Sequence, residues 1–154
     1  MLLNDLITIN AILPNLQAGT KKQALQELSD RAASLSGLAP REIFDALLQR
    51  ERLGSTGVGA GIAIPHGKMA KARKIFGVFA RLEKPVEFEA LDGAPVDLVF
   101  LLIAPESAGA DHLKALSRIA RVMRDPVITA RLRATRDPTA IFSMMTAAPT
   151  SHAA

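Results

Sequence analysis

Apolar positions in the first third of the chain recur at helical spacing. A helix is predicted to begin at Thr20, which can form a capping box with Gln23, and to end at Gly37. The apolar positions expected on its buried side are Ala24, Leu25, Leu28, Ala32 and Leu35. A second helix is predicted to begin at Pro40, because proline is favoured at the first helical position, and to end near residues 50–52. Its expected buried stripe consists of Ile43, Phe44, Leu47 and Leu48.

The middle of the chain carries short apolar runs that predict strands. These runs cover residues 62–64, 75–82 and 96–104, and a turn is expected at Asp92 and Gly93. The third run is apolar on both faces, which is typical of a central strand covered on two sides.

Helical spacing returns in the last third of the chain. One helix is predicted from about Ala110, a shorter one from Pro126 and a last one from Pro138. The first of these carries apolar residues at Leu113, Leu116, Ile119, Ala120 and Met123. Helices, then strands, then further helices predict an α/β fold, a single-domain sandwich with a mixed central β-sheet flanked by helices. We expect the domain to cover residues 1–146 and residues 147–154 to form a flexible tail.

Composition is that of an ordinary soluble globular protein and removes several kinds of site. The chain is 49% hydrophobic and 22% charged, and it contains no cysteine, so disulfides and thiolate metal sites are excluded. Only His66 and His112 are available within the domain, so a closed zinc site is unsupported, and no metal or cofactor is expected. There is no signal peptide pattern, and every apolar run falls short of the ~20 residues that span a bilayer. We therefore expect a cytoplasmic protein that is not integral to a membrane.

Positive charge concentrates in one part of the chain. The formal net charge is +4, and the stretch from 111 to 136 sets only Asp111 and Asp125 against many basic residues. These basic residues are Lys114, Arg118, Arg121, Arg124, Arg131, Arg133 and Arg136. Such a stretch can bind nucleic acid or an acidic protein, or can simply solvate helices, which the sequence favours. Tyrosine and tryptophan are absent, so stacking on bases has little support and nucleic acid is not an expected partner.

A glycine-rich run from Gly54 to Gly61 leads into Pro65, His66 and Gly67. Glycines can expose backbone N–H groups to an anion, and a neutral histidine is nucleophilic near pH 7. Pro65 stiffens the approach to His66, and Gly67 leaves room for a partner beside the imidazole. The spacing fails the Walker A, dinucleotide-binding and nucleophile-elbow motifs. The run therefore predicts a histidine that accepts and releases a phosphoryl group, with a hydrogen-bonded structural histidine as the alternative.

Two other positions could serve that chemistry. Arg50 supplies a permanent positive charge suited to phosphate. His112 lies near a predicted helix start, where Asp111 is the expected N-cap and free N–H groups attract anions. The alternative for His112 is a surface histidine in the first helical turn. His152 lies in the expected tail and is set aside.

These motifs resemble a known family. Residues Arg50–Gly57 and Ile64–Lys68 closely resemble the enzyme IIA proteins of the fructose/mannitol class in the bacterial phosphotransferase system, especially its nitrogen-regulatory branch. The segment Pro95–Phe100 and the pair His112-Leu113 also fit. The resemblance covers roughly residues 6–145, and its fold is an α/β sandwich with a mixed sheet.

The resemblance implies roles for particular residues. His66 would carry the phosphoryl group, donated by a phosphorylated carrier protein of the HPr kind. Arg50 would bind the phosphoryl group or the partner, and His112 would contact the phosphoryl group without carrying it. Ser55 and Thr56 are secondary candidates for hydroxyl or backbone contacts.

The resemblance also implies a regulatory phosphocarrier whose phosphorylation state governs binding to targets such as potassium-transport or sensor proteins. Two alternatives stay open. The chain could be a sugar-specific transport component that passes the phosphoryl group to a IIB partner. It could also be a non-enzymatic binding module that uses the basic stretch from Lys114 to Arg136.

Overall fold

Strand β6 (Val96–Pro105) forms the centre of the sheet in the computed structural model, which describes residues 2–147. Residues 98–104 of β6 are all buried, as predicted for a strand covered on both faces. The other strands of the described sheet are β1 (Ile12–Leu16), β2 (Gly57–Gly59), β3 (Ile62–Ala63), β4 (His66–Met69) and β5 (Phe76–Val86). Their order is β1-β5-β6-β3-β2, and β4 also pairs with β6. Strand β6 is antiparallel to β5 and parallel to β3 and β4, so the sheet is mixed, as predicted.

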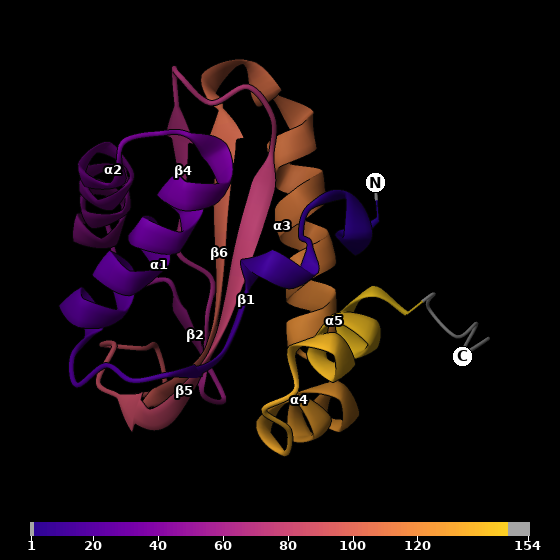
Figure 1. Ribbon diagram of the computed structural model, residues 1–154. Helices are drawn as coiled ribbons and strands as arrows, with labels where there is room; N and C mark the ends of the chain where they lie inside the picture. Colours follow the sequence, from indigo (N-terminus) through magenta and orange to yellow (C-terminus); the bar gives the residue numbers. More distant parts are fainter. Residues whose placement is uncertain (1, 148–154) are drawn as a thin grey trace.

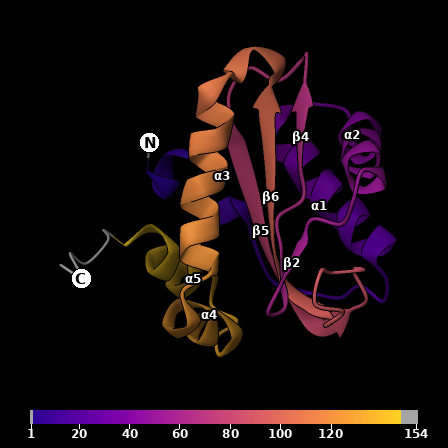
Figure 2. The same ribbon diagram turned by 180° about the vertical axis from the view of Figure 1, so that it is seen from behind.

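Helices cover both faces of this sheet. The helices that the structure describes are α1 (Lys21–Ser36), α2 (Pro40–Arg52), α3 (Ala110–Met123), α4 (Pro126–Arg133) and α5 (Pro138–Thr146). Short 3₁₀ helices are η1 (Leu3–Asp5), η2 (Ile9–Ala11) and η3 (Glu106–Ala108). Figures 1 and 2 show α1 and α2 on one face, with α3, α4 and α5 on the other. The predicted sandwich is therefore confirmed.

Successive residues of β6 fill two separate cores, because neighbouring side chains on a strand point to opposite faces. The side chains in the core beneath α1 and α2 are Val99, Leu101 and Ile103. Those in the core beneath α3, α4 and α5 are Leu98, Phe100 and Leu102. This alternation explains why the segment is apolar on both faces.

The predicted helix boundaries depend on local capping. Thr20 Oγ1 accepts a hydrogen bond from the Gln23 backbone N–H (3.1 Å), and Gly37, at φ +78°, ends α1. The Gln23 side chain accepts from Gly19 rather than from Thr20, so the reciprocal bond of the expected capping box is displaced by one residue. Proline at the first position begins α2, α4 and α5, as predicted.

Strands β1, β2 and β4 are absent from the sequence-based prediction. Pro14 interrupts the apolar run of β1, which lies at the sheet edge where proline is tolerated. Strand β2 is a Gly-Val-Gly segment, and β4 reads His-Gly-Lys-Met, so neither has the expected alternation. These strands form because they pair with neighbouring strands, and their own sequences carry no strand pattern.

An interruption between strands β3 and β4 positions His66 in the candidate site. The two strands follow one another along β6, and Ile64 and Pro65 lie between them. Ile64 donates its N–H to the Thr56 carbonyl (3.0 Å), while the Pro65 carbonyl accepts from Leu102 N–H (2.9 Å). Proline has no N–H to continue the ladder, so the strand is interrupted there. His66 is thus the first residue of a new strand, whereas the sequence pattern predicts it just after a strand end.

Helix α3 begins and faces differently from the prediction. Gly109, at φ +56°, is its N-cap, and Asp111 lies in the first turn, so the expected Asp111 cap is wrong. Leu113 is expected in the apolar stripe but is 70% exposed. The buried residues of α3 are His112, Ala115, Ile119 and Met123. His112 occupies the inward position, which turns Leu113 outward. In α1, Leu35 is likewise 40% exposed.

The expected tail falls mostly outside the described residues. Residues 148–154 are not described, so the predicted flexible tail, including His152, and the predicted end of the domain at 146 stay expectations.

Candidate active site

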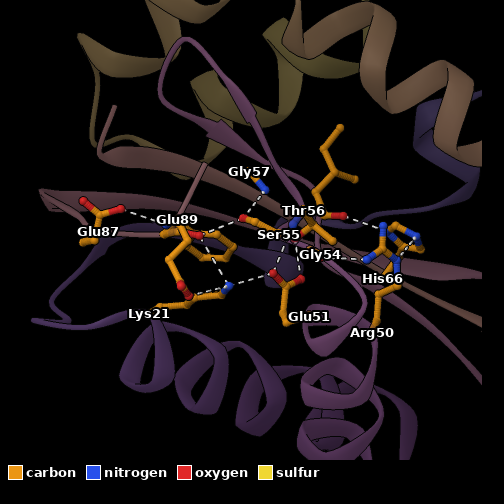
Figure 3. Close-up of polar contacts among 12 residues, drawn as sticks. Lys21, Arg50, Glu51, Gly54, Ser55, Thr56, Gly57, His66, Glu87 and Glu89 are labelled. Atoms are coloured by element: carbon orange, nitrogen blue, oxygen red, sulfur yellow. Dashed lines mark hydrogen bonds and ion pairs between the residues drawn. The ribbon is translucent and has the colours of Figure 1, made fainter. Parts of the chain in front are cut away.

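His66 stands at the start of β4 with both ring nitrogens engaged (Figure 3). Its Nδ1 lies 2.8 Å from the Ile64 carbonyl oxygen, which can only accept, so Nδ1 carries the hydrogen. Arg50 Nε donates to His66 Nε2 at 3.3 Å, and an arginine can only donate. Both contacts therefore specify the same tautomer, in which Nε2 holds the nucleophilic lone pair.

Arg50 reaches His66 from the last turn of α2. Its Nη1 donates to the Gly54 carbonyl (2.8 Å), which fixes the guanidinium across the helix end. A cation at a helix C-terminus is also favoured by the exposed carbonyls there. These two bonds use only part of the five-donor guanidinium. The remaining N–H groups, which have no partner among residues 2–147, can bind phosphoryl oxygens.

His112 is buried beside His66, so the surface alternative is wrong. The side chain is 8% exposed, and the two imidazole centroids lie 5.6 Å apart with planes at 62°. Within the described chain, its buried Nε2 has no hydrogen-bond partner. A buried polar atom without a partner is costly, which makes this nitrogen a ready contact for a bound group.

Both histidines have a lowered pKa. Burial is the main cause for His66, and the positive charge of Arg50 adds to it; the Ile64 hydrogen bond and the charge of Glu51 oppose the shift. Burial also lowers the pKa of His112, with smaller contributions from His66 and Lys68. Since the ordinary value is 6.5, both imidazoles are neutral at pH 7. The His66 lone pair is therefore available for attack.

The glycines before His66 form the hairpin between β2 and β3. Gly59 and Gly61 have φ of +103° and +80° at the turn between β2 and β3. A Cβ on Gly57 would lie 2.8 Å from the Cβ of Ala90, so a residue with a side chain cannot pack at this position without a shift. The N–H of Gly57 binds Ser55 Oγ (3.0 Å), and that of Ala60 binds an Asp92 carboxylate oxygen (2.9 Å). The expectation that the glycine run exposes its N–H groups to an anion is therefore wrong for Gly57.

Ser55 and Thr56 do not direct their hydroxyls at His66. Ser55 donates to the Phe88 carbonyl (2.7 Å), and Thr56 Oγ1 donates to Glu51 Oε2 (2.5 Å). Both hydroxyl hydrogens are thus committed to holding the loop after α2. The structure gives these two secondary candidates a supporting place around the site.

Gly67 lies beside His66 on β4 and faces α2. A Cβ there would lie 3.5 Å from the Ala46 Cβ, an ordinary van der Waals contact. Packing within the described chain therefore does not require a glycine. The predicted role of Gly67, leaving room for a partner, remains a prediction.

Sequence reasoning missed Glu51 and its ion pair with Lys21. The Glu51 side chain is 6% exposed, and its Oε1 lies 2.9 Å from Lys21 Nζ. Lys21 also stands 4.7 Å above the centre of the Phe88 ring. A carboxylate in the last turn of a helix is disfavoured by the helix dipole, which is the one available signal that Glu51 has a tertiary partner. Its partner 30 positions away leaves no local pattern.

The basic stretch is divided among several surfaces. Arg133 pairs with Asp97 (2.8 Å), and Arg136 pairs with Glu83. A shallow surface cleft of about 250 Å³ is lined on α3 by Lys114, Ser117, Arg118 and Arg121. Within residues 2–147, no three His, Asp or Glu side chains gather as a metal site would require. The helices of that range are all too short or too polar to cross a membrane.

Comparison with known proteins identifies the family. The model for the phosphoenolpyruvate-dependent sugar phosphotransferase system, EIIA 2, matches residues 5–148. A nitrogen regulatory protein of Bradyrhizobium diazoefficiens is 59% identical over 99% of this chain and 100% of its own length. The corresponding protein of Escherichia coli is 43% identical over 82% of this chain and 78% of its own.

Solved structures and a sugar-transport protein are also similar to this chain. The crystal structure of nitrogen regulatory protein IIA-Ntr from Neisseria meningitidis has a TM-score of 0.88 and 34% identity, covering 92% of this chain and 97% of its own. The fructose-specific EIIABC component of Bacillus subtilis is 34% identical over 94% of this chain, which spans 23% of that protein. The IIA of an E. coli mannitol IIA–IIB complex, at 22% identity and a TM-score of 0.76, shares the fold. The chain therefore belongs to the EIIA type-2 family of the phosphoenolpyruvate-dependent phosphotransferase system and has a phosphocarrier role in that system.

Proposed function

We propose that His66 Nε2 accepts a phosphoryl group from a phosphorylated HPr-like carrier, and that the phosphorylation state of His66 regulates target proteins of a nitrogen-related phosphotransferase system. The observation that carries this proposal is the pair of hydrogen bonds on His66. Nδ1 keeps its hydrogen on the Ile64 carbonyl, which leaves the Nε2 lone pair facing Arg50.

The transfer step needs no group beyond the two proteins. The Nε2 lone pair forms a bond to phosphorus while the phosphorus–nitrogen bond of the carrier breaks, and its electron pair returns to the carrier nitrogen. Nδ1 keeps its proton, and the Ile64 carbonyl stabilises the positive charge that develops on the ring. One phosphoramidate replaces another, so positioning and charge stabilisation can supply the catalysis.

Arg50 and His112 are suited to stabilise the transferred group. In this proposal the Arg50 guanidinium moves its Nε hydrogen bond from His66 to a phosphoryl oxygen when Nε2 becomes bonded to phosphorus. His112 Nε2, which has no partner in the described part of the chain, takes another phosphoryl oxygen. Both contacts strengthen as the group arrives, as transition-state stabilisation requires.

The regulatory part of the proposal rests on relatives. The Bradyrhizobium, Escherichia and Neisseria proteins are each named nitrogen regulatory proteins. A phosphohistidine adds negative charge at the site and can thereby change the affinity for a target. Potassium-transport and sensor proteins are the target classes that the family resemblance suggests, and the cytoplasm is where these partners would meet the chain.

A sugar-transport role is the second candidate. The Bacillus relative is a fructose-specific transport component, and the Escherichia structure is named as a complex with phosphorylated IIB. Rapid transfer from phosphorylated His66 to a IIB protein would favour this role. Slow transfer together with state-dependent target binding favours regulation.

Phosphoenolpyruvate-driven labelling tests the proposal. With the general enzyme and the HPr-like carrier, the wild-type chain should gain one acid-labile phosphoryl group, and His66→Ala should gain none. His112→Ala is the matched histidine control and should still be labelled, at a changed rate. Label that persists in folded His66→Ala would overturn the proposal. Target binding that is unchanged in that variant would instead favour the non-enzymatic binding module.

A further inference from the structure

Glu51 is a buried carboxylate with three donors from two parts of the chain. Its Oε1 accepts from Lys21 Nζ (2.9 Å) and from the Thr56 N–H (3.0 Å), and its Oε2 accepts from Thr56 Oγ1 (2.5 Å). The side chains of Glu51 and Lys21 are 6% and 18% exposed, so solvent screens the pair only weakly. Charge-assisted bonds to a buried acceptor are the stronger kind. The carboxylate therefore fixes Thr56 firmly against the start of α1.

Thr56 connects Glu51 to the Nδ1 side of His66. The Thr56 carbonyl accepts from the Ile64 N–H (3.0 Å), and the Ile64 carbonyl binds His66 Nδ1 (2.8 Å). A displacement of Thr56 would therefore move the acceptor that selects the His66 tautomer.

A second path connects Glu51 to the Nε2 side. The Glu51 carbonyl accepts from Gly54 N–H (3.1 Å), and the Gly54 carbonyl accepts from Arg50 Nη1 (2.8 Å). The same guanidinium donates to His66 Nε2 (3.3 Å). Figure 3 shows Lys21, Glu51 and Thr56 on one side of this site and Arg50, Gly54 and His66 on the other.

We propose that the Lys21–Glu51 pair is a positioning device for phosphoryl transfer, which sets the tautomer and orientation of His66 through Thr56 on one side and Arg50 on the other. Neither residue hydrogen-bonds to the His66 ring, so each positions the ring through other residues, while the charge of Glu51 also opposes the lowering of the His66 pKa. This inference rests on the proposed function of His66, and it assigns Glu51 a purpose that its place at a helix end does not supply.

A stabilising ion pair without influence on His66 is the competing explanation, and three substitutions separate the two. Glu51→Gln keeps the side-chain shape but removes the charge, and Thr56→Val removes only the hydroxyl donor. The matched control is Glu42→Gln, which breaks the exposed Lys71–Glu42 pair (3.1 Å). Thermal unfolding measures the stability of each variant, and nitrogen-edited NMR of the His66 ring in the free chain measures its tautomer.

We expect Glu51→Gln to mix the His66 tautomers and to slow transfer at saturating phosphorylated carrier by about tenfold or more, because small misplacements of reacting groups are costly. The carrier concentration that gives half the maximal rate should change by less than about twofold, since the change does not remove a binding contact. Thr56→Val should act in the same direction more weakly, and Glu42→Gln should change neither reading.

The proposal is overturned if Glu51→Gln and Thr56→Val lower Tm but keep the wild-type tautomer and transfer rate. Should Glu51→Gln fail to fold, Thr56→Val decides alone by the same two readings. Failure of wild-type labelling would refute the proposed function, whereas the tautomer measurement on the unphosphorylated chain still decides whether Glu51 positions His66.

Discussion

The chemistry at the scale of single residues depends on the two nitrogens of one ring. A carbonyl that can only accept and a guanidinium that can only donate leave a single tautomer for neutral His66. Burial lowers its pKa and so keeps the ring neutral near pH 7. The role that we propose for His66 as a nucleophile therefore rests on hydrogen-bond geometry and burial, without a separate general base.

Transfer to His66 should depend on pH in a direction set by its lowered pKa. We expect the transfer rate to fall as the pH is lowered, with a midpoint below pH 6.5, because protonation of Nε2 removes the attacking lone pair. NMR titration of the His66 ring should give the same midpoint. In the Arg50→Gln variant the pKa of His66 should rise, since the charge of Arg50 is one cause of its lowered value.

The same shift carries a consequence for stability. Below pH 6.5 the unfolded chain binds protons at His66 and His112 before the folded chain does, so the free energy of unfolding should decrease as the pH falls through that range. A His66 pKa at or above 6.5 in the folded wild type would contradict this effect of burial.

Among the elements, the break between β3 and β4 places His66, the proposed phosphoryl acceptor. Strand β3 ends at Ala63, Ile64 and Pro65 follow, and β4 begins at His66, so the His66 ring stands at a strand start beside the central strand β6. The β2–β3 hairpin before it is packed tightly by its glycines. Packing requires a glycine at Gly57 but not at Gly67.

Matched alanine substitutions at Gly57 and Gly67 test whether each glycine serves packing or partner access. Gly57→Ala should destabilise the fold by about 1–3 kcal/mol, because the new Cβ overlaps Ala90. Gly67→Ala should change stability by less than about 0.5 kcal/mol, since its contact with Ala46 is ordinary. Its transfer rate from the carrier should nevertheless fall if Gly67 leaves room for the partner. Chemical denaturation and transfer assays measure the two effects, and a Gly67→Ala chain with wild-type transfer would remove Gly67 from the site.

At the scale of the whole molecule, the sequence predicted those elements whose own residues show a helix or strand pattern. The long helices, β5, β6 and the layered sandwich follow from apolar periodicity and from proline at helix starts. Strands β1, β2 and β4 did not, because pairing with other strands overrides their weak local preference. Likewise the outward turn of Leu113 follows from the burial of His112 against His66.

The candidate site divides in the same way. His66, Arg50 and His112 could be chosen from residue chemistry and motif, and the fold brings them together. The Lys21–Glu51 pair could not, since it joins the start of α1 to the end of α2. The glycine run misled because it forms a hairpin, in which the Gly57 N–H binds the Ser55 hydroxyl oxygen and the Ala60 N–H binds the Asp92 carboxylate.

The most direct test of the phosphocarrier role locates the phosphorus atom in the phosphorylated chain. The ¹⁵N-labelled protein is phosphorylated by the carrier, and phosphorus–nitrogen couplings identify the bonded atom. We predict a single phosphoryl group on Nε2 of His66, with Nδ1 still protonated against the Ile64 carbonyl. A phosphoryl group on Nδ1 of His66, on another residue, or no phosphorylation at all would contradict that role for His66 Nε2.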